Sequence, residues 1–240
     1  LGVPFAGLFG ACSTMAEGLA LGAVLCEGGA ARNLLAMASS HFCAAERQFR
    51  TPLSYGAVRT PTAQWTATAA GCCLMQPQGE GVGIAAATFG RVQDYQVKDI
   101  NNMGAAMAPA AASTLLHYFK DTGTEPQEFD CIYTGDLGQV GSQLLRELLA
   151  AEGLLIKNHV DCGCILFDAN EQSVKSGGSG PGCCAAVLCG HILPRLRRGS
   201  QKRVLFTATG ALMSQTTFLQ KETIPAVAHL VELRAPEKEK

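Results

Sequence analysis

Short apolar runs alternate along the chain with longer segments whose apolar residues recur every three or four positions. The short runs are typical of buried strands, and the longer periodic segments are typical of helices. We predict strands at 3–9, 33–39, 65–75, 82–89, 130–134, 161–167, 203–208 and 226–233. We predict helices at 14–26, 105–120, 139–151 and 183–196. Strands that alternate with helices in this way favour an α/β fold.

Two of these segments carry more specific expectations. The helix at 139–151 is amphipathic, and its spacing predicts one buried stripe made of Val140, Leu144, Leu148 and Ala151. The residues from 40 to 64 are mostly polar, and we expect a loop there.

One pattern occurs twice in the chain. A glycine-containing loop, a cysteine, an apolar helix, a glycine stop and a buried strand follow one another from Cys12 and again from Cys183, about 171 residues later. This repeat predicts two equivalent halves, at 1–80 and 81–240. Because far fewer residues precede the first copy than the second, and because the chain begins with Leu1, we expect the first half to be N-terminally truncated.

Composition excludes several classes of protein. Charged residues are only 16% and hydrophobic residues 48%, unlike a disordered chain. The net charge of -1 gives no basic surface, so we expect no nucleic-acid partner. No segment is long and apolar enough for a membrane span, and no signal peptide is seen, so we expect a protein that is not secreted. The eleven cysteines include two adjacent pairs, which favours buried thiols in a reducing compartment over a disulfide framework.

Cys12 is the sharpest candidate for chemistry. A cysteine at a helix N-terminus faces unpaired N–H groups and the positive end of the helix dipole, which lower the pKa of its thiol. Cys12 is therefore either a nucleophile or a structural cysteine. Asp136, in the loop Thr134–Gly138, is an anion that would raise the pKa of a nearby thiol and repel a developing oxyanion. The alternative role of Asp136 is to cap the helix at 139–151.

Further candidates lie in two other loops. The glycine loop that contains Gly178, Ser179 and Gly180 offers backbone N–H groups before a helix, which suit an anion, although it could equally be a tight turn that allows close packing. His41 follows the strand at 33–39 and either binds a ligand or lies packed or exposed. Cys162 and Cys164 lack a second pair at zinc spacing, and no phosphate-binding loop is present, so we predict no metal and no cofactor.

A set of longer motifs resembles one family. The strings FGACSTMAEG, SSHFCAAERQFR, GRVQDYQVKDINNMGAAMAPAAA, YTGDLGQVGS, NHVDCG, SGGSGPGC, ATGALMS and QKETIPAVAHLVEL follow in order through nearly the whole chain. They resemble the family of stage V sporulation protein AD of endospore-forming bacteria, within the thiolase superfamily. The resemblance implies an αβαβα sandwich of two pseudo-twofold halves. One departure is Pro181, which stands where a second cysteine of the glycine loop is expected.

The resemblance also implies a function. The family is implicated in binding dipicolinic acid and in its uptake into the developing spore, together with other stage V sporulation membrane proteins. We therefore expect a dipicolinic acid ligand, with or without calcium, and a place on the spore inner membrane or the cytoplasmic face of the forespore. Relatives dimerise through the strand that precedes the cysteine, here 3–9, so we also expect a homodimer.

The thiolase resemblance assigns roles to the candidate loops. Cys12 stands at the nucleophile position, whereas Asp136 and the loop around Ser179 stand where a His or Asn is expected. Because both partner positions are lost, we expect binding without catalysis. The expected ligand-binding residues are Cys12, Ser13, His41, Asp136, Gly178, Ser179 and Gly180. The alternatives are a residual acyltransferase that uses Cys12 and a scaffold that serves only assembly.

Overall fold

The computed structural model describes residues 2–49 and 58–237. Its helices are α1 (Thr14–Glu27), α2 (Phe42–Phe49), α3 (Met103–Thr122), α4 (Gly138–Ala151), α5 (Cys162–Leu166), α6 (Pro181–Val187), α7 (Leu193–Arg197) and α8 (Gln215–Leu219). Short helical turns are η1 (Ala11–Ser13), η3 (Pro126–Glu128) and the π-helical η4 (Leu188–Ile192). The strands are β1 (Leu34–Ser40), β2 (Trp65–Thr66), β3 (Ala69–Met75), β4 (Gly83–Thr88), β5 (Cys131–Thr134), β6 (His159–Asp161), β7 (Gly178–Ser179), β8 (Arg203–Ala211) and β9 (Ala226–Arg234).

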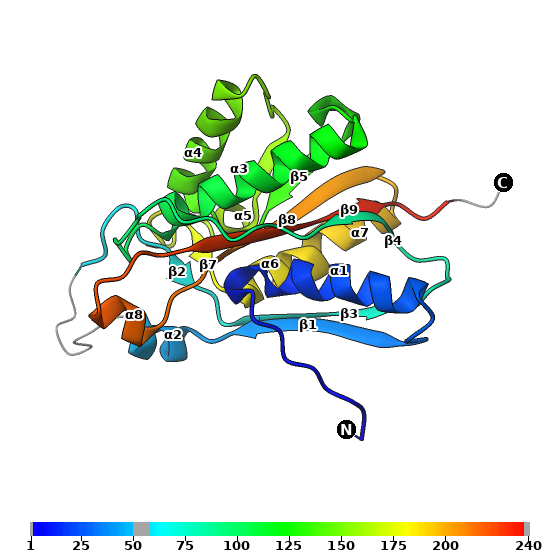
Figure 1. Cartoon of the computed structure of the whole chain (residues 1–240), viewed down its shortest axis with the longest axis horizontal. Helices are drawn as coiled ribbons and strands as arrows, with labels where there is room; N and C mark the ends of the chain where they lie inside the picture. Colours follow the sequence, from blue (N-terminus) through cyan, green and yellow to red (C-terminus); the bar gives the residue numbers. More distant parts are fainter. Residues whose placement is uncertain (1, 50–57, 238–240) are drawn as a thin grey trace.

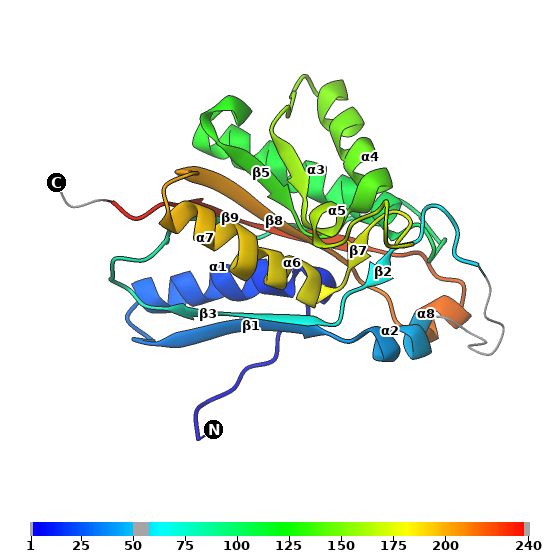
Figure 2. The same cartoon turned by 180° about the vertical axis from the view of Figure 1, so that it is seen from behind.

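The elements form stacked layers. A five-stranded sheet has the order β4-β9-β8-β5-β6, and β1 pairs with β3 in an antiparallel two-stranded sheet. Helices α1, α6 and α7 lie between the two sheets, while α3 and α4 cover the other face of the larger sheet (Figures 1 and 2). The protein is thus the mixed α/β structure that the alternating pattern predicts.

The core lies on both faces of the larger sheet. Met107, Leu115 and Leu145 belong to a buried cluster between the sheet and helices α3 and α4. Met15 and Phe206 belong to a second cluster between the two sheets. Because both faces of β8 are covered, its residues after Arg203 are all buried, and no side chain of that stretch alternates toward solvent.

The two copies of the repeat are placed in one layer. The helices α1 and α6 contact each other between the sheets, and each leads into a strand of a different sheet, β1 for the first and β8 for the second. This placement agrees with a twofold relation between the copies. The division into halves at residue 80 stays a prediction.

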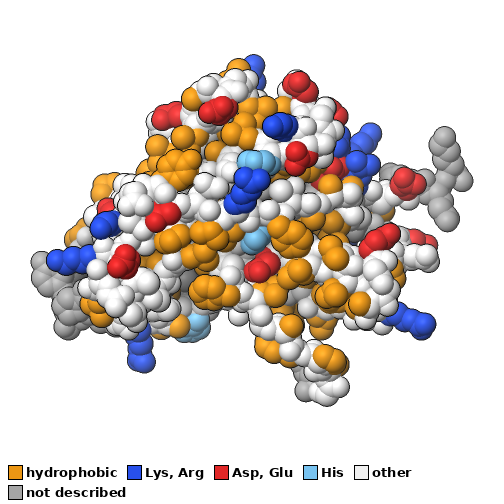
Figure 3. Space-filling view, in the orientation of Figure 1, with side chains coloured by type: hydrophobic (Ala, Val, Ile, Leu, Met, Phe, Trp, Pro, Cys, Tyr) orange, Lys and Arg blue, Asp and Glu red, His pale blue; other side chains and the backbone are white. Residues whose placement is uncertain are grey.

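The strand predicted at 3–9 is wrong. Residues 3–9 form neither a helix nor a strand, and Val3, Phe5 and Phe9 are 62%, 88% and 80% exposed. Apolar side chains of this segment project from the lower edge of Figure 3. An apolar run becomes a strand only where a neighbouring strand accepts its backbone hydrogen bonds, and these residues lack one in the described structure.

The strand predicted at 161–167 is also wrong. Strand β6 ends at Asp161 and helix α5 begins at Cys162. A run this short has no periodicity that separates a strand from a buried helical turn. The predicted strand at 65–75 is divided into β2 and β3, with a break at residues 67–68.

Three further expectations change in detail. The predicted polar loop contains helix α2, and its residues 50–57 lie outside the described residues. The buried stripe of α4 includes Leu145 and Leu149, whereas Ala151 is exposed, so the predicted stripe is displaced by about one position. The helix predicted at 183–196 is helical throughout but passes through the π-helical η4, after which Pro194 lies in the first turn of α7.

In the part of the chain that the structure describes, no helix is both long and apolar enough to cross a membrane.

Candidate functional site

Three loops and one strand meet around the carboxylate of Asp136. The first loop is the turn η1, which holds Cys12. The second loop connects β5 to α4 and carries Asp136, and the third carries Ser179 and Gly180 before α6. Strand β8 adds Thr209 from the centre of the larger sheet. Residues far apart in the sequence are therefore neighbours at this point.

The turn that holds Cys12 is tightly constrained. Ser13 Oγ donates a hydrogen bond to the Gly10 carbonyl at 2.6 Å, and Thr14 Oγ1 donates to the Ala11 carbonyl at 2.7 Å. Ala11 has a φ of 49°, in the left-handed region that costs a residue with a Cβ about 1–2 kcal/mol. Such strain is typical of functional sites, because the surrounding structure must hold it in place. The turn thus presents Cys12 in a fixed position.

Asp136 is fully buried and is the hub of the site. Its Oδ2 accepts hydrogen bonds from Ser179 Oγ and from the Gly180 N–H, both at 2.9 Å. Its Oδ1 accepts one from Thr209 Oγ1 at 3.0 Å, and the carboxylate also accepts from the Cys12 thiol. Neutral donors thus surround the carboxylate.

The capping role considered for Asp136 is wrong. The residue before α4 is Leu137, and the N–H groups of Gly138 and Val140 in the first turn of this helix donate to the side chains of Asp161 and Ser176, not to Asp136. The carboxylate turns away from α4 and toward the glycine loop, where Ser179 and Gly180 bind it.

Burial dominates the electrostatics of the pair formed by Cys12 and Asp136. It raises the pKa of the Asp136 carboxyl, because the charged form loses its hydration. The pKa of the Cys12 thiol is raised well above its ordinary value, first by burial and then by the charge and hydrogen bond of Asp136. The expected lowering of this pKa by the helix end is therefore wrong, while the expected effect of Asp136 on the thiol is confirmed. Cys12 lies in η1, before the first turn of α1, beside a carboxylate.

A second buried carboxylate holds the loop that carries Asp136. Asp161 Oδ1 accepts from Thr134 Oγ1 at 2.7 Å and from the Leu137 N–H at 2.8 Å. Its Oδ2 accepts from the Gly138 N–H at 2.9 Å. Burial raises the pKa of Asp161 to about 7. Asp161 is thus a positioning residue, which orders the backbone on both sides of Asp136.

Contacts from the other half of the chain fix the glycine loop. Gln64 Nε2 donates to the carbonyl oxygens of Asp136 and Gly178, at 2.5 and 3.1 Å, and so joins two of the loops. Strand β2 pairs in parallel with β7, which contains Gly178 and Ser179. Ser40 Oγ accepts from the Gly182 N–H at 3.0 Å and donates to the Ala67 carbonyl at 2.7 Å.

The structure brings together four of the residues singled out from the sequence, namely Cys12, Asp136, Ser179 and Gly180. Ser13 is buried in the same turn as Cys12, and Gly178 lies in β7. His41 is exposed directly after β1, and the contacts that join this strand to the glycine loop come from its neighbour Ser40.

Sequence reasoning missed Thr209, Asp161, Gln64 and Ser40. One usable signal was present, because Thr207 and Thr209 alternate in a strand that is otherwise apolar and buried after Arg203. Two residues apart in a strand, they point to the same face of the sheet. Nothing in the sequence around Gln64 or Asp161 distinguishes them from surface residues.

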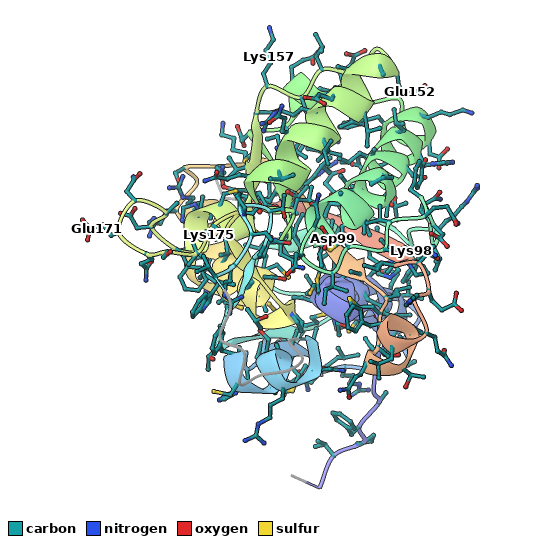
Figure 4. All side chains as sticks on the ribbon, turned by 90° about the vertical axis from the view of Figure 1, so that its left-hand side faces the viewer. Lys98, Asp99, Glu152, Lys157, Glu171 and Lys175 are labelled. Carbon is teal, nitrogen blue, oxygen red and sulfur yellow. The ribbon has the colours of Figure 1, made fainter. Side chains whose placement is uncertain are left out.

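A cavity of about 260 Å³ lies away from this site. Lys98 lines it from the loop that leads into α3, next to Asp99 (Figure 4), and Lys221 lines it from the segment after α8. Apolar side chains, including Met213 and Phe218, line the rest. Among the described residues, no group of three His, Cys, Asp or Glu side chains is arranged to hold a metal ion.

Solved structures of condensing enzymes are similar in fold. The chain matches 3-oxoacyl-[acyl-carrier-protein] synthase III from Aquifex aeolicus with a TM-score of 0.56 and 13% identity, over 95% of this chain and 66% of the enzyme. It matches the tetronic acid condensing enzyme AbyA1 with a TM-score of 0.59 and 16% identity, over 97% of this chain and 69% of the enzyme. The chain thus spans about two thirds of the length of these enzymes. At such identities the likeness shows a shared thiolase-like fold, which confirms the predicted fold class.

Sequence comparison is more specific. The model of the family described as stage V sporulation protein AD matches residues 1–234. Stage V sporulation protein AD of Bacillus subtilis (strain 168) is 44% identical over 230 residues, which are 95% of this chain and 68% of that protein. The likeness in fold and this identity over nearly the whole chain lead to one conclusion: the chain belongs to the stage V sporulation protein AD family, whose thiolase-like fold here carries an aspartate at the centre of its cysteine site.

Proposed function

We propose that the protein binds dipicolinic acid at the site around Cys12 and Asp136, without catalysis, and supports its uptake into the developing spore. The observation that carries the proposal is the position of the Asp136 carboxylate, which lies beside the Cys12 thiol and accepts hydrogen bonds from two hydroxyls and one backbone N–H. In this role the protein acts as a homodimer with other stage V sporulation membrane proteins, peripheral to the spore inner membrane or on the cytoplasmic face of the forespore.

The geometry disfavours acyl transfer. The thiolate is the nucleophilic form of cysteine, and burial beside Asp136 raises the pKa of the Cys12 thiol. Attack on an acyl group would create an oxyanion, which needs donors that are not already bound to a carboxylate. At this site Ser179, Thr209 and Gly180 already donate to Asp136.

The same set of donors suits a dicarboxylic acid. Burial raises the pKa of Asp136, and a ligand carboxylate placed beside it would raise this pKa further, so that Asp136 takes up a proton as the ligand binds and donates a hydrogen bond to the ligand carboxylate. The hydroxyls of Ser179 and Thr209 can then turn from Asp136 to the ligand. A calcium ion bridging Asp136 and the ligand would achieve the same neutralisation, since calcium prefers oxygen ligands. The ligand-binding set is Cys12, Ser13, His41, Asp136, Gly178, Ser179 and Gly180.

Calorimetric titration of the protein with dipicolinate, with and without calcium, tests the proposal. We expect Cys12→Trp to abolish binding by filling the site, and Cys12→Ala to weaken it modestly. The matched control is Cys43→Trp, which adds the same side chain at an exposed cysteine. Circular dichroism establishes that each variant is folded, and Ser179→Ala gives a milder change of the site should the tryptophan variant not fold.

Unchanged dipicolinate affinity in folded Cys12→Trp would place the ligand elsewhere. The cavity lined by Lys98 and Lys221 is then the next candidate, because these two lysines outnumber its one acidic lining residue, Glu222. Acyl transfer is tested separately by incubation with acetyl-CoA. We expect no acyl group on Cys12 by peptide mass spectrometry, and an adduct absent from Cys12→Ser would favour the acyltransferase alternative.

A further inference from the structure

Two cysteines face each other at a distance from the Cys12 site. The sulfur atoms of Cys73 and Cys189 are 3.9 Å apart, although the residues are 116 positions apart in the sequence. Cys73 lies on β3, and Cys189 lies in the π-helical η4 between α6 and α7. Both residues are partly exposed, so a small oxidant can reach them from solvent.

The backbone around this pair is held closely. A Cβ placed on Gly71 of β3 would lie 2.4 Å from the carbonyl oxygen of Ala185 in α6, so the strand and the helix touch through their backbones. Side chains alternate along a strand, and Cys73 therefore turns toward the helical layer while its neighbour Cys72 is exposed on the other face. Single π turns are frequently found at functional sites, and here the π turn carries Cys189.

The two thiols differ in acidity. The pKa of Cys189 is lowered to about 6, mainly by the hydrogen bond with Cys73 and further by the charge of Arg197. The pKa of Cys73 is raised, mainly by its contact with Cys189. One member of the pair is therefore the better nucleophile and the other keeps its proton. This asymmetry is typical of an attacking and a resolving cysteine.

We propose that Cys73 and Cys189 are a redox pair that closes to a disulfide when the protein meets a peroxide. The Cys189 thiolate attacks one oxygen of hydrogen peroxide, and the O–O bond breaks. Hydroxide departs, and Cys189 is now a sulfenic acid. The Cys73 sulfur then attacks the Cys189 sulfur, the S–S bond forms, and the Cys73 proton leaves with the displaced hydroxide as water. In total two thiols lose two electrons and two protons, and the peroxide is reduced to two molecules of water.

The bond would join two layers of the fold. The sulfur atoms must approach from 3.9 Å to about 2.05 Å, which needs a rotation of the side chains. The disulfide would tie β3 to the helical layer across a long segment of chain. Because a crosslink restricts the unfolded chain most when the closed loop is long, we expect the oxidised protein to melt about 5–10 °C higher.

The test is mild oxidation followed by peptide mapping under non-reducing conditions. The protein is treated with one equivalent of hydrogen peroxide, and its melting temperature is measured before and after addition of dithiothreitol. We expect a peptide crosslinked through Cys73 and Cys189, a melting temperature that falls back on reduction, and neither result in Cys189→Ser. Cys43→Ser, which removes an exposed thiol elsewhere, should behave as the wild type.

Three results would overturn the proposal. The first is a crosslink through Cys72 instead of Cys73, because Cys72, and not Cys73, would then lie on the face of β3 that is turned toward Cys189. The second is oxidation of Cys189 to sulfinic acid with no crosslink. The third is a crosslinked peptide of unchanged abundance in Cys189→Ser. Dipicolinate binding takes no part in these measurements, so they stand apart from the proposed function.

Discussion

Glu232 is a buried carboxylate near the end of strand β9, and its replacement by glutamine tests how charge stabilises this fold. Its Oε1 lies 2.7 Å from Arg203 Nε and 2.7 Å from Arg234 Nε. The hydroxyl of Tyr118 also donates to the carboxylate. Glutamine keeps the shape of the side chain but removes its charge, and its amide group meets donors instead of acceptors.

The size of the effect follows from the pKa of Glu232. Burial raises this pKa, but the hydrogen bonds from Arg203 and Tyr118 outweigh it, and the pKa falls from 4.5 to about 2. A shift of this size corresponds to roughly 3 kcal/mol. Since the side chains of Arg203 and Arg234 are 23% and 56% exposed, water screens part of the attraction. We therefore expect Glu232→Gln to lower the free energy of unfolding by about 2 kcal/mol.

The pH dependence gives a second, independent test. A carboxyl group whose pKa is lowered in the folded state contributes stability above pH 4.5, and this contribution is lost as the pH falls through about 2. The difference between wild type and Glu232→Gln should therefore be full at pH 7 and less than half as large at pH 3.

Urea denaturation, followed by the fluorescence of the single tryptophan and by circular dichroism, measures both quantities. The matched control is Glu128→Gln. Glu128 also contacts Arg203, at 3.1 Å, but is 44% exposed and should cost less than about 1 kcal/mol. A loss below about 0.5 kcal/mol in Glu232→Gln at pH 7, or a loss that is equal at pH 7 and pH 3, would refute the reasoning.

Three further predictions concern the site. Asp136→Asn removes the charge beside Cys12, so alkylation of this cysteine by iodoacetamide at pH 8, read by peptide mass, should be about tenfold faster, and an equal rate would contradict the assigned contact. Gly210→Ala places a Cβ 2.2 Å from the carbonyl oxygen of Gly10, so the melting temperature should fall by about 5 °C. A melting temperature within about 1 °C of the wild type would contradict this close approach. Because burial raises the pKa of Asp161 to about 7, the stability it gives is present below pH 4 and decreases as the pH rises to 7. Urea titrations at pH 5, 6 and 8 should show this decrease in the wild type and its absence in Asp161→Asn.

Long elements could be predicted from the sequence, and short ones could not. Helices α1, α3 and α4 lie within a few residues of their predicted bounds, because several turns of periodic apolar residues leave little ambiguity. The segments 3–9 and 161–167 carry too few residues for such a pattern, and their structure depends on neighbours. A strand needs a partner, and the first segment has none in the described structure.

The candidate site divides in the same way. Cys12 was recognisable because it precedes an apolar helix, and Asp136 and Ser179 because the thiolase resemblance places them in the two partner loops. The structure brings the three residues together. For Thr209 the alternation with Thr207 could indicate a shared face of the strand, but not the partner Asp136, which is 73 positions away in the sequence. The pKa of Cys12 was misjudged for the same reason, because the helix end is a local feature whereas burial depends on the whole fold.

The close contact of β3 with α6 sets an order of events during synthesis of the chain. Cys73 reaches its neighbour Cys189 only after 116 further residues have been added. At about 5–20 residues per second, this takes roughly 6–23 s. During that interval the inner face of β3 has no α6 to cover it. The nascent chain therefore passes through a state in which an apolar strand is open to wrong partners, and a chaperone that binds apolar strands would act on this intermediate.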